Sequence, residues 1–327
     1  MKTIALLAVS AIAFTGITAV TASPANAAGV KVTPLGSHEG EFCARDRAMI
    51  FEDPDGTRIM VDPGMSVTGG DDPRIGKLDG VLLTSVHVDH IGGFALAAPN
   101  GGACGKPAIK VKKMPSSNFA EIVVKKGAVS LAGGEMRSFL RAQVGAAGGN
   151  AKKQVNVLRF GAEGKIGGVR VAIVPVTHSN GANPGFLTKE LAATLKKDGL
   201  TAYVGPDNGF ILTFTNGLVV YLSGDSGITA EQDVTVRRFY KAKLAIINGG
   251  DMFTSGPKEA AFSINELIKP NAAIPQHMNE QATKGGKLVA GTKTAKFAAM
   301  VKGIPVHLPL SGRTMEFDAN AKCVSGC

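Results

Sequence analysis

The chain has 327 residues, of which 44% are hydrophobic, and a formal net charge of +10 at pH 7. This length can form one large domain with a sizeable core and does not require two. Tryptophan is absent, tyrosine is rare, and lysine and arginine are scattered, so the composition gives no basic, aromatic surface for nucleic acid. The positive charge favours solubility and also suits anionic small molecules.

The first 27 residues have the pattern of a secretory signal peptide. Lys2 precedes an apolar stretch over residues 4–14, and small residues at 23–28 allow a cut after Ala27. The alternative is a membrane anchor. The apolar stretch is, however, marginal in length compared with the ~20 residues that a membrane span needs, and threonines make its end less apolar. We expect cleavage, which removes one lysine and lowers the charge to +9, and a periplasmic or secreted protein without a stable membrane span.

Four cysteines, Cys43, Cys104, Cys323 and Cys327, allow three disulfide pairings in an exported protein. Cys323 and Cys327 can close a short terminal loop, which makes Cys43 with Cys104 the favoured second pair. Free buried thiols stay open as an alternative.

The first half of the chain begins with strand signals. Residues 47–52 and 57–61 flank the turn sequence DPDG, which predicts a hairpin. Residues 78–84 include three consecutive apolar residues and predict a buried strand. Residues 95–154 are less regular, with expected helices near 116–126 and 135–144, and we interpret them as an insertion over one face of a sheet.

The second half repeats the alternation of strands and turns. Strands are expected at 169–174, 209–214, 218–222 and 242–247, and helices at 229–240, 257–268 and 293–301. Lys269 precedes a proline, which predicts the end of the middle helix. This mixture suggests two packed sheets with helices outside, in one domain over residues 28–327.

The densest group of metal-binding side chains lies in the run TSVHVDHIGG at 84–93, directly after the buried strand. His87 and Asp89 share one side of an extended segment, whereas His90 begins a helical turn. A tight loop can therefore direct His87 toward one metal ion and Asp89 with His90 toward a second. Imidazole and carboxylate ligands suit Zn²⁺, Fe or Mn²⁺.

This run resembles the His-x-His-x-Asp-His signature of the metallo-β-lactamase superfamily, with Ser85 in place of the first histidine. Four further motifs follow the family's order and together extend the match over residues 32–310: IMVDPG at 59–64, PVTH at 175–178, YLSGDSG at 221–227 and IPQH at 274–277.

The resemblance implies an α/β fold, a four-layer αββα sandwich. It also implies one or two Zn²⁺ ions, with Mn²⁺ or Fe as alternatives, and a set of ligands: His87 and His178 for the first metal, Asp89, His90 and His277 for the second, and Asp225 bridging them. Asp62 would orient ligands without binding metal.

Ser85 is the departure from the family pattern, because a neutral hydroxyl is a poor ligand compared with imidazole. The first site could be lost, could hold a loose metal completed by water, or could use Ser85 to hold a bound water. We favour one tight metal and one weaker one.

Two segments resemble the ascorbate-6-phosphate lactonase-like branch of the superfamily: LGSH at 35–38 and the run at 247–260. His38 would line the pocket or cap a turn. Asp251 would support the site or simply form a turn. His307 lies in an apolar stretch without a motif and is left out of the site.

The resulting hypothesis is an exported metal-dependent hydrolase that acts on a small ester, lactone, amide or phosphoester. Metal-activated water would be the nucleophile, and Asp89 would orient it or accept its proton. The alternatives are a non-catalytic metal-binding protein, because of Ser85, and an iron-dependent oxidoreductase, because the fold also carries di-iron centres.

Overall fold

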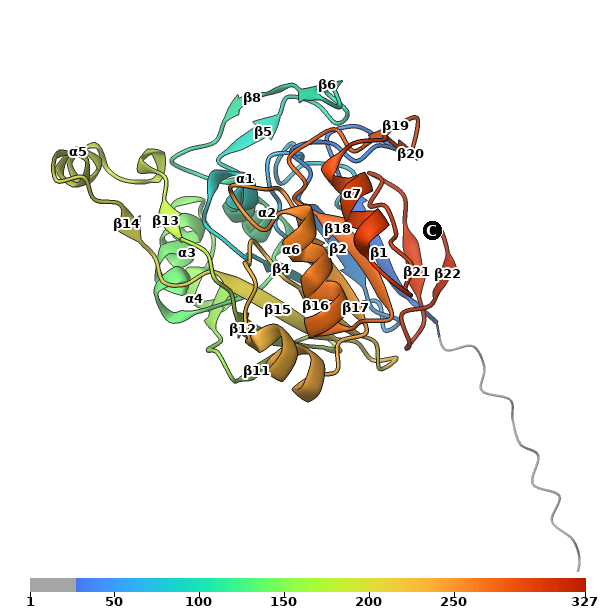
Figure 1. Cartoon of the computed structure of the whole chain (residues 1–327). Helices are drawn as coiled ribbons and strands as arrows, with labels where there is room; N and C mark the ends of the chain where they lie inside the picture. Colours follow the sequence, from blue (N-terminus) through green and yellow to red (C-terminus); the bar gives the residue numbers. More distant parts are fainter. Residues whose placement is uncertain (1–27) are drawn as a thin grey trace, which may run out of the picture.

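The computed structural model describes residues 28–327 (Figure 1), so the expected signal peptide lies outside the described residues. The first of two six-stranded sheets has the order β22-β21-β1-β2-β3-β4, and β3 and β4 are parallel. Its strands are β1 (Val30–Leu35), β2 (Ala48–Glu52), β3 (Arg58–Val61), β4 (Gly80–Leu82), β21 (Met315–Phe317) and β22 (Cys323–Ser325).

The second sheet has the order β11-β12-β15-β16-β17-β18. Its strands are β11 (Glu163–Ile166), β12 (Val169–Pro175), β15 (Asn208–Thr213), β16 (Val219–Leu222), β17 (Leu244–Asn248) and β18 (Ala272–Gln276). β15 is antiparallel to both β12 and β16, whereas β16, β17 and β18 are parallel. Consequently, β12, β16, β17 and β18 all end at the same edge of the sheet.

The inner faces of the two sheets form the central core. Side chains alternate between the faces of a strand, so in β12 Val171 and Ile173 point into this core while Ala172 and Val174 pack on the outer side. In the first sheet, Ile50 and Met60 face outward against a separate helical layer.

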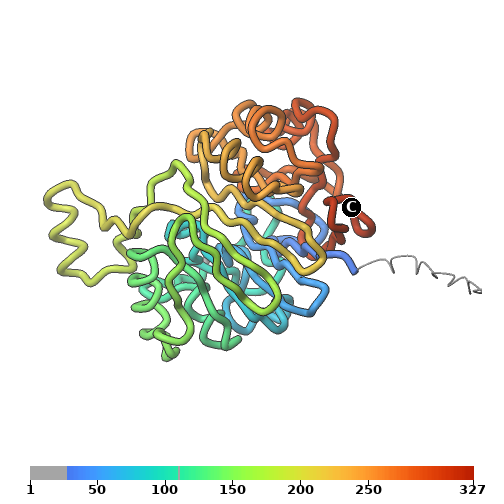
Figure 2. Tube along the Cα trace, turned by 90° about the horizontal axis from the view of Figure 1, so that it is seen from below, coloured from blue at the N-terminus to red at the C-terminus, as the bar shows by residue number. Residues whose placement is uncertain are grey.

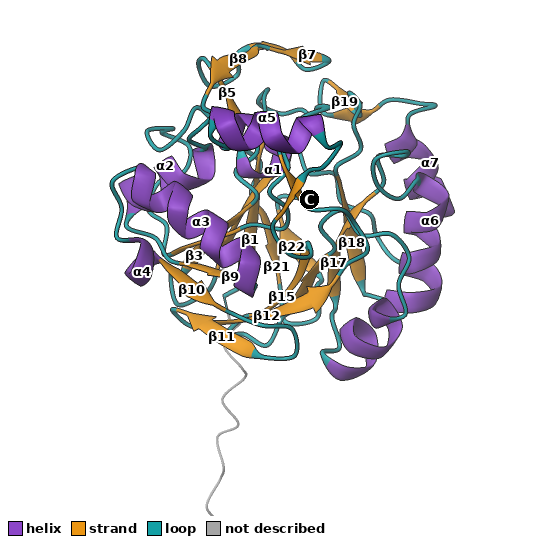
Figure 3. Cartoon of the chain, turned by 90° about the vertical axis from the view of Figure 1, so that its left-hand side faces the viewer, coloured by secondary structure: helices purple, strands orange, loops and turns teal. Residues whose placement is uncertain are grey.

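Helices cover both outer faces (Figure 3). On the first sheet lie α2 (Asn118–Lys126) and α3 (Gly134–Ala146). On the second lie η2 (Gln232–Phe239), α6 (Pro257–Phe262), η3 (Ser263–Ile268) and α7 (Lys293–Met300). The four-layer αββα sandwich expected from the sequence is therefore confirmed. As expected, the α6–η3 helix ends before Pro270, at Lys269.

The segment 95–154 has two parts with different places in the fold. Its helices α2 and α3, with the short α4 (Ala151–Gln154), belong to the outer layer, and β9 (Ser130–Ala132) pairs with β10 (Val155–Val157). Its first part rises above the sheets as short strands (Figure 1), namely β5 (Phe94–Leu96), β6 (Gly102–Ala103), β7 (Lys106–Pro107) and β8 (Ile109–Lys112).

A second excursion projects from the body as an arm (Figure 2). It contains β13 (Gly181–Ala182), η1 (Pro184–Phe186), α5 (Lys189–Lys197) and β14 (Ala202–Tyr203), and β13 pairs with β14 at its base. A small hairpin of β19 (Thr283–Lys284) and β20 (Lys287–Leu288) follows the last large strand. Within residues 28–327, no helix combines the length and apolar character needed to cross a bilayer.

Both favoured cysteine pairs are bonded in the structure. Cys43 and Cys104 have Cα atoms 5.0 Å apart, and this bond ties the loop after β1 to the β6–β7 hairpin. Cys323 and Cys327 close the C-terminal loop. The described residues therefore contain no free thiol.

Candidate metal centre

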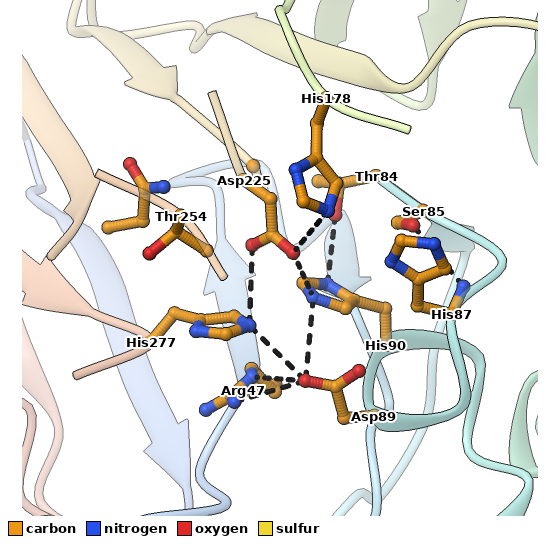
Figure 4. A network of polar contacts seen from close by, with 12 residues as sticks. Arg47, Thr84, Ser85, His87, Asp89, His90, His178, Asp225, Thr254 and His277 are labelled. Carbon is orange, nitrogen blue, oxygen red and sulfur yellow. Dashed lines mark hydrogen bonds and ion pairs between the residues drawn. The ribbon is translucent and has the colours of Figure 1, made fainter. Parts of the chain in front are cut away.

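The six candidate metal ligands converge at one edge of the sandwich (Figure 4). They follow the ends of β4, β12, β16 and β18, because these strands all end at this edge. The loop after β4 carries three of them and the other loops one each: His87, Asp89 and His90, then His178, Asp225 and His277.

The loop after β4 is shaped by a short helix, α1 (Val88–Ile91), that begins immediately after His87. The helix ends at Gly92 with φ +78°, and a Cβ there would lie 2.5 Å from the carbonyl oxygen of Gly64. Glycine is therefore required at this position. The expected strand over 78–84 is shorter in the structure, because the chain leaves the sheet after Leu82 to form this loop.

The ligand atoms form two groups of three, and within each group they lie within 4.8 Å of one another. One group is His87, His178 and Asp225, and the other is Asp89, His90 and His277. Asp225 connects the groups, since its Oδ2 lies 3.7 Å from His178 Nε2 and 3.0 Å from His90 Nε2. The division matches the one that the sequence resemblance implied.

Asp62 fixes the orientation of His90. Its Oδ2 lies 2.9 Å from His90 Nδ1 and accepts a 2.6 Å hydrogen bond from the Thr84 hydroxyl, while its Oδ1 accepts one from the Thr84 amide. A proton on Nδ1 toward the carboxylate leaves the Nε2 lone pair for a metal. Asp62 thus has the place predicted for it, beside the ligands and not among them.

Asp225 depends on the residue before it. Gly224 has φ +55°, and a Cβ there would lie 2.9 Å from the carbonyl oxygen of Asn208. Burial of Asp225 opposes ionisation, but the nearby His90 and His277 imidazoles hold the pKa of its carboxyl below the usual range. An ionised carboxylate is the form that binds metal.

Arg47 is a component that sequence reasoning missed. Its guanidinium is almost fully buried, and its Nη2 lies 3.1 Å from Asp89 Oδ2 and 2.7 Å from Asn279 Oδ1. Burial of Asp89 opposes ionisation, but its neighbours, led by His90, hold the pKa of this carboxyl well below the usual range. Arg47 stands in a strand-like segment of the sequence, and no pattern there distinguishes it from a surface arginine.

The protonation of the histidines suits a metal site. Burial lowers the pKa of His87, His178 and His277, which favours the neutral imidazoles that bind metal. His90 differs: burial acts in the same direction, but Asp225 and other carboxylates raise its pKa well above the usual value. In the protein without metal, a proton on His90 therefore balances part of the negative charge.

The donor set fits a divalent cation by a further criterion. His90 Nε2 and Asp225 Oδ1 are buried and, within residues 28–327, have no hydrogen bond of acceptable geometry. Buried polar atoms normally have partners, and a cation bound between these two would supply one. Imidazole and carboxylate donors facing one point suit Zn²⁺, Mn²⁺ or Fe.

Three other sequence candidates lie outside the ligand groups. His38 is half-buried in a turn, where its carbonyl accepts a hydrogen bond from the Glu41 amide, and it does not line the cleft. Asp251 is exposed, forms a turn, and lies 3.4 Å from the Lys293 ammonium. Ser85 is fully buried, and its hydroxyl accepts a hydrogen bond from the His87 amide.

The ligands open onto a cleft of about 1090 Å³. Its wall combines apolar side chains with two cationic ones, Arg45 and Lys106. The β5–β8 segment contributes Phe94, Lys106 and Ile109, and the loop after β17 contributes Met252 and Phe253, which are 89% and 68% exposed. Exposed apolar residues beside buried polar ligands are typical of a small-molecule site.

An αββα sandwich with two histidine–aspartate groups at one edge defines a protein of the metallo-β-lactamase fold. Residues 57–278 match the model of the beta-lactamase superfamily domain, so the chain belongs to this family.

Known proteins agree with this assignment. The chain is 29% identical to a metal-dependent hydrolase of Cupriavidus necator and 27% identical to one of Polynucleobacter asymbioticus, each match covering 81% of both chains. Among solved structures, it is similar to Igni18, a metallo hydrolase from Ignicoccus hospitalis, with a TM-score of 0.56, 20% identity, and coverage of 88% of this chain and 99% of that one.

The fold also occurs in a protein with a different chemistry. CmlA, a diiron β-hydroxylase from Streptomyces venezuelae, matches with a TM-score of 0.53 and 13% identity over 90% of this chain and 55% of its own. These structural similarities concern the fold alone.

Proposed function

We propose that this protein is an exported metal-dependent hydrolase that cleaves a small ester, lactone, amide or phosphoester with an activated water molecule. The observation that carries the proposal is the convergence of two three-residue ligand groups, joined by Asp225, at the floor of an open cleft. The names of the relatives, all metal-dependent hydrolases, support the same chemistry.

The position of each residue indicates its role in hydrolysis. Metal bound at such a site lowers the pKa of water and polarises the group under attack. Asp89 lines the cleft, and its Oδ2 lies 3.2 Å from His277 Nε2, so its carboxylate can orient the water and accept its proton. Arg47 contacts the same oxygen, with its Nη2 3.1 Å from Asp89 Oδ2.

The cleft favours a substrate with both an apolar and an anionic part. Met252, Phe253 and Phe94 provide apolar contact, whereas Arg45 and Lys106 can pair with a carboxylate or phosphate. A cleft of this size accommodates a small molecule.

Export is part of the proposal, because two features favour it. Residues 1–27 have the composition of a signal peptide. The Cys43–Cys104 and Cys323–Cys327 bonds suit an oxidising compartment such as the periplasm. Detection of the protein in periplasmic or culture fractions, with an N-terminus at Ala28, would test this part.

The central test is metal content together with hydrolysis. Periplasm-expressed protein should contain about one or two equivalents of zinc, manganese or iron and should hydrolyse members of an ester, lactone, amide and phosphodiester panel. His90→Ala should lose metal and activity, while His307→Ala, outside the centre, should keep both. Protein without metal, unaffected by His90→Ala, would refute the site, and bound metal without turnover would favour a non-catalytic metal-binding protein.

An iron-dependent oxidoreductase is the second candidate, because CmlA combines this fold with a diiron centre. Two equivalents of iron with substrate-dependent oxygen consumption would favour it. Zinc as the bound metal, with hydrolysis and no oxygen uptake, would exclude it.

A further inference from the structure

The place of the family's missing histidine is not empty, because a buried carboxylate from another segment lies beside Ser85. This residue is Asp207, which immediately precedes β15 and is 1% exposed. In the part of the chain that the structure describes, neither of its carboxyl oxygens has a hydrogen bond of good geometry, although the Ser85 hydroxyl lies within reach of the group. Burial raises the pKa of the Asp207 carboxyl to about 8, and the charges of His90 and Asp225 also act on this pKa, which places Asp207 near the metal centre.

Three contacts hold the two segments together. The Asn208 amide donates a 2.8 Å hydrogen bond to the Thr84 carbonyl. The fully buried Asn180 accepts from the Val86 amide with its Oδ1 and donates to the Pro206 carbonyl with its Nδ2. These contacts therefore fix Asp207 in a buried position beside Ser85.

The hydrogen-bonding capacity of Ser85 explains how the pair can work. A hydroxyl has one proton and two acceptor lone pairs. One lone pair accepts the 3.2 Å hydrogen bond from the His87 amide. If the proton is donated to Asp207, the second lone pair stays free, and Ser85 lies next to His87 in the first ligand group (Figure 4).

We propose that Ser85 and Asp207 together replace the missing histidine: Asp207 accepts the hydroxyl proton of Ser85 in a hydrogen bond and thereby directs the serine oxygen to the metal held by His87, His178 and Asp225. Asp207 is a positioning residue: burial raises the pKa of its carboxyl to about 8, and a nearby divalent cation would favour the ionised form that accepts this hydrogen bond. Burial without a partner is unfavourable for a carboxyl group, and a nearby divalent cation offsets this cost. The inference rests on the proposed metal centre.

The test measures metal binding and not activity. Metal-free wild type, Asp207→Asn, Ser85→Ala and the double variant would be titrated with Zn²⁺ against a chromophoric chelator, and bound metal would be counted after dialysis. We expect two equivalents in the wild type, with the weaker one bound about 10- to 100-fold less tightly in each single variant, as for other outer partners of metal ligands. The double variant should lose no more than either single one, because both act on the same ligand.

Two controls separate this effect from misfolding. Asp53→Asn removes another buried carboxylate, which binds Thr215 at the opposite end of the strands, and it should keep both metal affinities. Ser85→His combined with Asp207→Asn restores the family's histidine and should recover the weaker site. Circular dichroism would check the fold of each variant, and Ser85→Ala alone still tests the pair if Asp207→Asn does not fold.

The outcomes distinguish this inference from the proposed function. A wild type without metal would refute the metal centre as a whole. A wild type that binds metal with the same stoichiometry and affinities as Asp207→Asn would overturn only the role of Asp207. A loss in Asp207→Asn without any loss in Ser85→Ala would overturn the action through the serine.

Discussion

The hydrogen bond from His90 to Asp62 allows a specific prediction, because asparagine can replace Asp62 with little change in shape. Asp62 has φ +48°, a conformation that asparagine tolerates better than most residues. In Asp62→Asn the side-chain oxygen can still accept the 2.8 Å hydrogen bond that the Thr84 amide now donates to Asp62 Oδ1. The amide NH₂ would then face His90 Nδ1 and require that nitrogen to be an acceptor.

The substitution would therefore invert the His90 tautomer and place the Nε2 proton where the metal should bind. Loss of such outer partners weakens metal binding about 10- to 100-fold, which corresponds to about 1.4–2.8 kcal/mol. The free energy of unfolding of the metal-free protein should fall by about 1.5–3 kcal/mol, since a charge-assisted hydrogen bond is lost.

Two measurements test this reasoning. Competition with a chromophoric chelator gives the Zn²⁺ affinity, and ¹⁵N NMR at a pH where the imidazole is neutral shows which His90 nitrogen carries the proton. Wild-type affinity in Asp62→Asn, or an unchanged Nδ1–H tautomer, would refute the proposed role of Asp62.

Three further predictions concern the surroundings of the centre. Arg47→Met leaves Asp89 without its buried cation. In urea denaturation, the free energy of unfolding should fall by about 3 kcal/mol in the presence of chelator and by less with Zn²⁺ bound. Equal losses under both conditions would contradict the charge argument. Gly224→Ala should destabilise the fold and weaken metal binding, because its Cβ meets Asn208. The control Gly217→Ala, at φ +89° with open space around it, should show the effect of backbone strain alone. Similar losses of stability and metal affinity in both variants would count against the clash. Cys43→Ser with Cys104→Ser opens a loop of sequence separation 61 and should lower stability by about 4 kcal/mol, more than opening the Cys323–Cys327 loop; denaturation midpoints without a shift would disprove this contribution.

Much of the fold could be predicted because short sequence segments determine the local structure. The DPDG turn between 47–52 and 57–61 predicts a hairpin, and the structure forms it with Met49 opposite Val61. The candidate metal ligands could be selected for a similar reason, since they occur in short motifs that directly follow strands, and the structure brings these side chains together. The boundaries of β4 were less accurate, because tertiary packing decides where the chain leaves a sheet.

Arg47 and Asp207 could not be predicted, because their roles arise from contacts between distant segments. Arg47 reaches Asp89 across 42 residues and Asn279 across 232. Asp207 follows a proline in an ordinary turn-like sequence, and only the fold shows that it is buried beside Ser85. The same limit applies to Asp251, whose glycine-rich context fits a turn as well as a site.

The ligand groups also join parts of the chain that are far apart in the sequence and are therefore synthesised at different times. Each group combines side chains from the loop after β4, in the first sheet, with side chains that follow β12, β16 or β18 in the second sheet. During folding, a cation can therefore bind fully only after both sheets have met, and it then acts as a cross-link between them. By mass action, free metal at 1,000 times its dissociation constant adds about 4 kcal/mol to the stability of the folded state. The concentration of free metal in the compartment should thus influence how long the protein stays folded there. Chelation of the metal should shorten that lifetime without any change in the sequence.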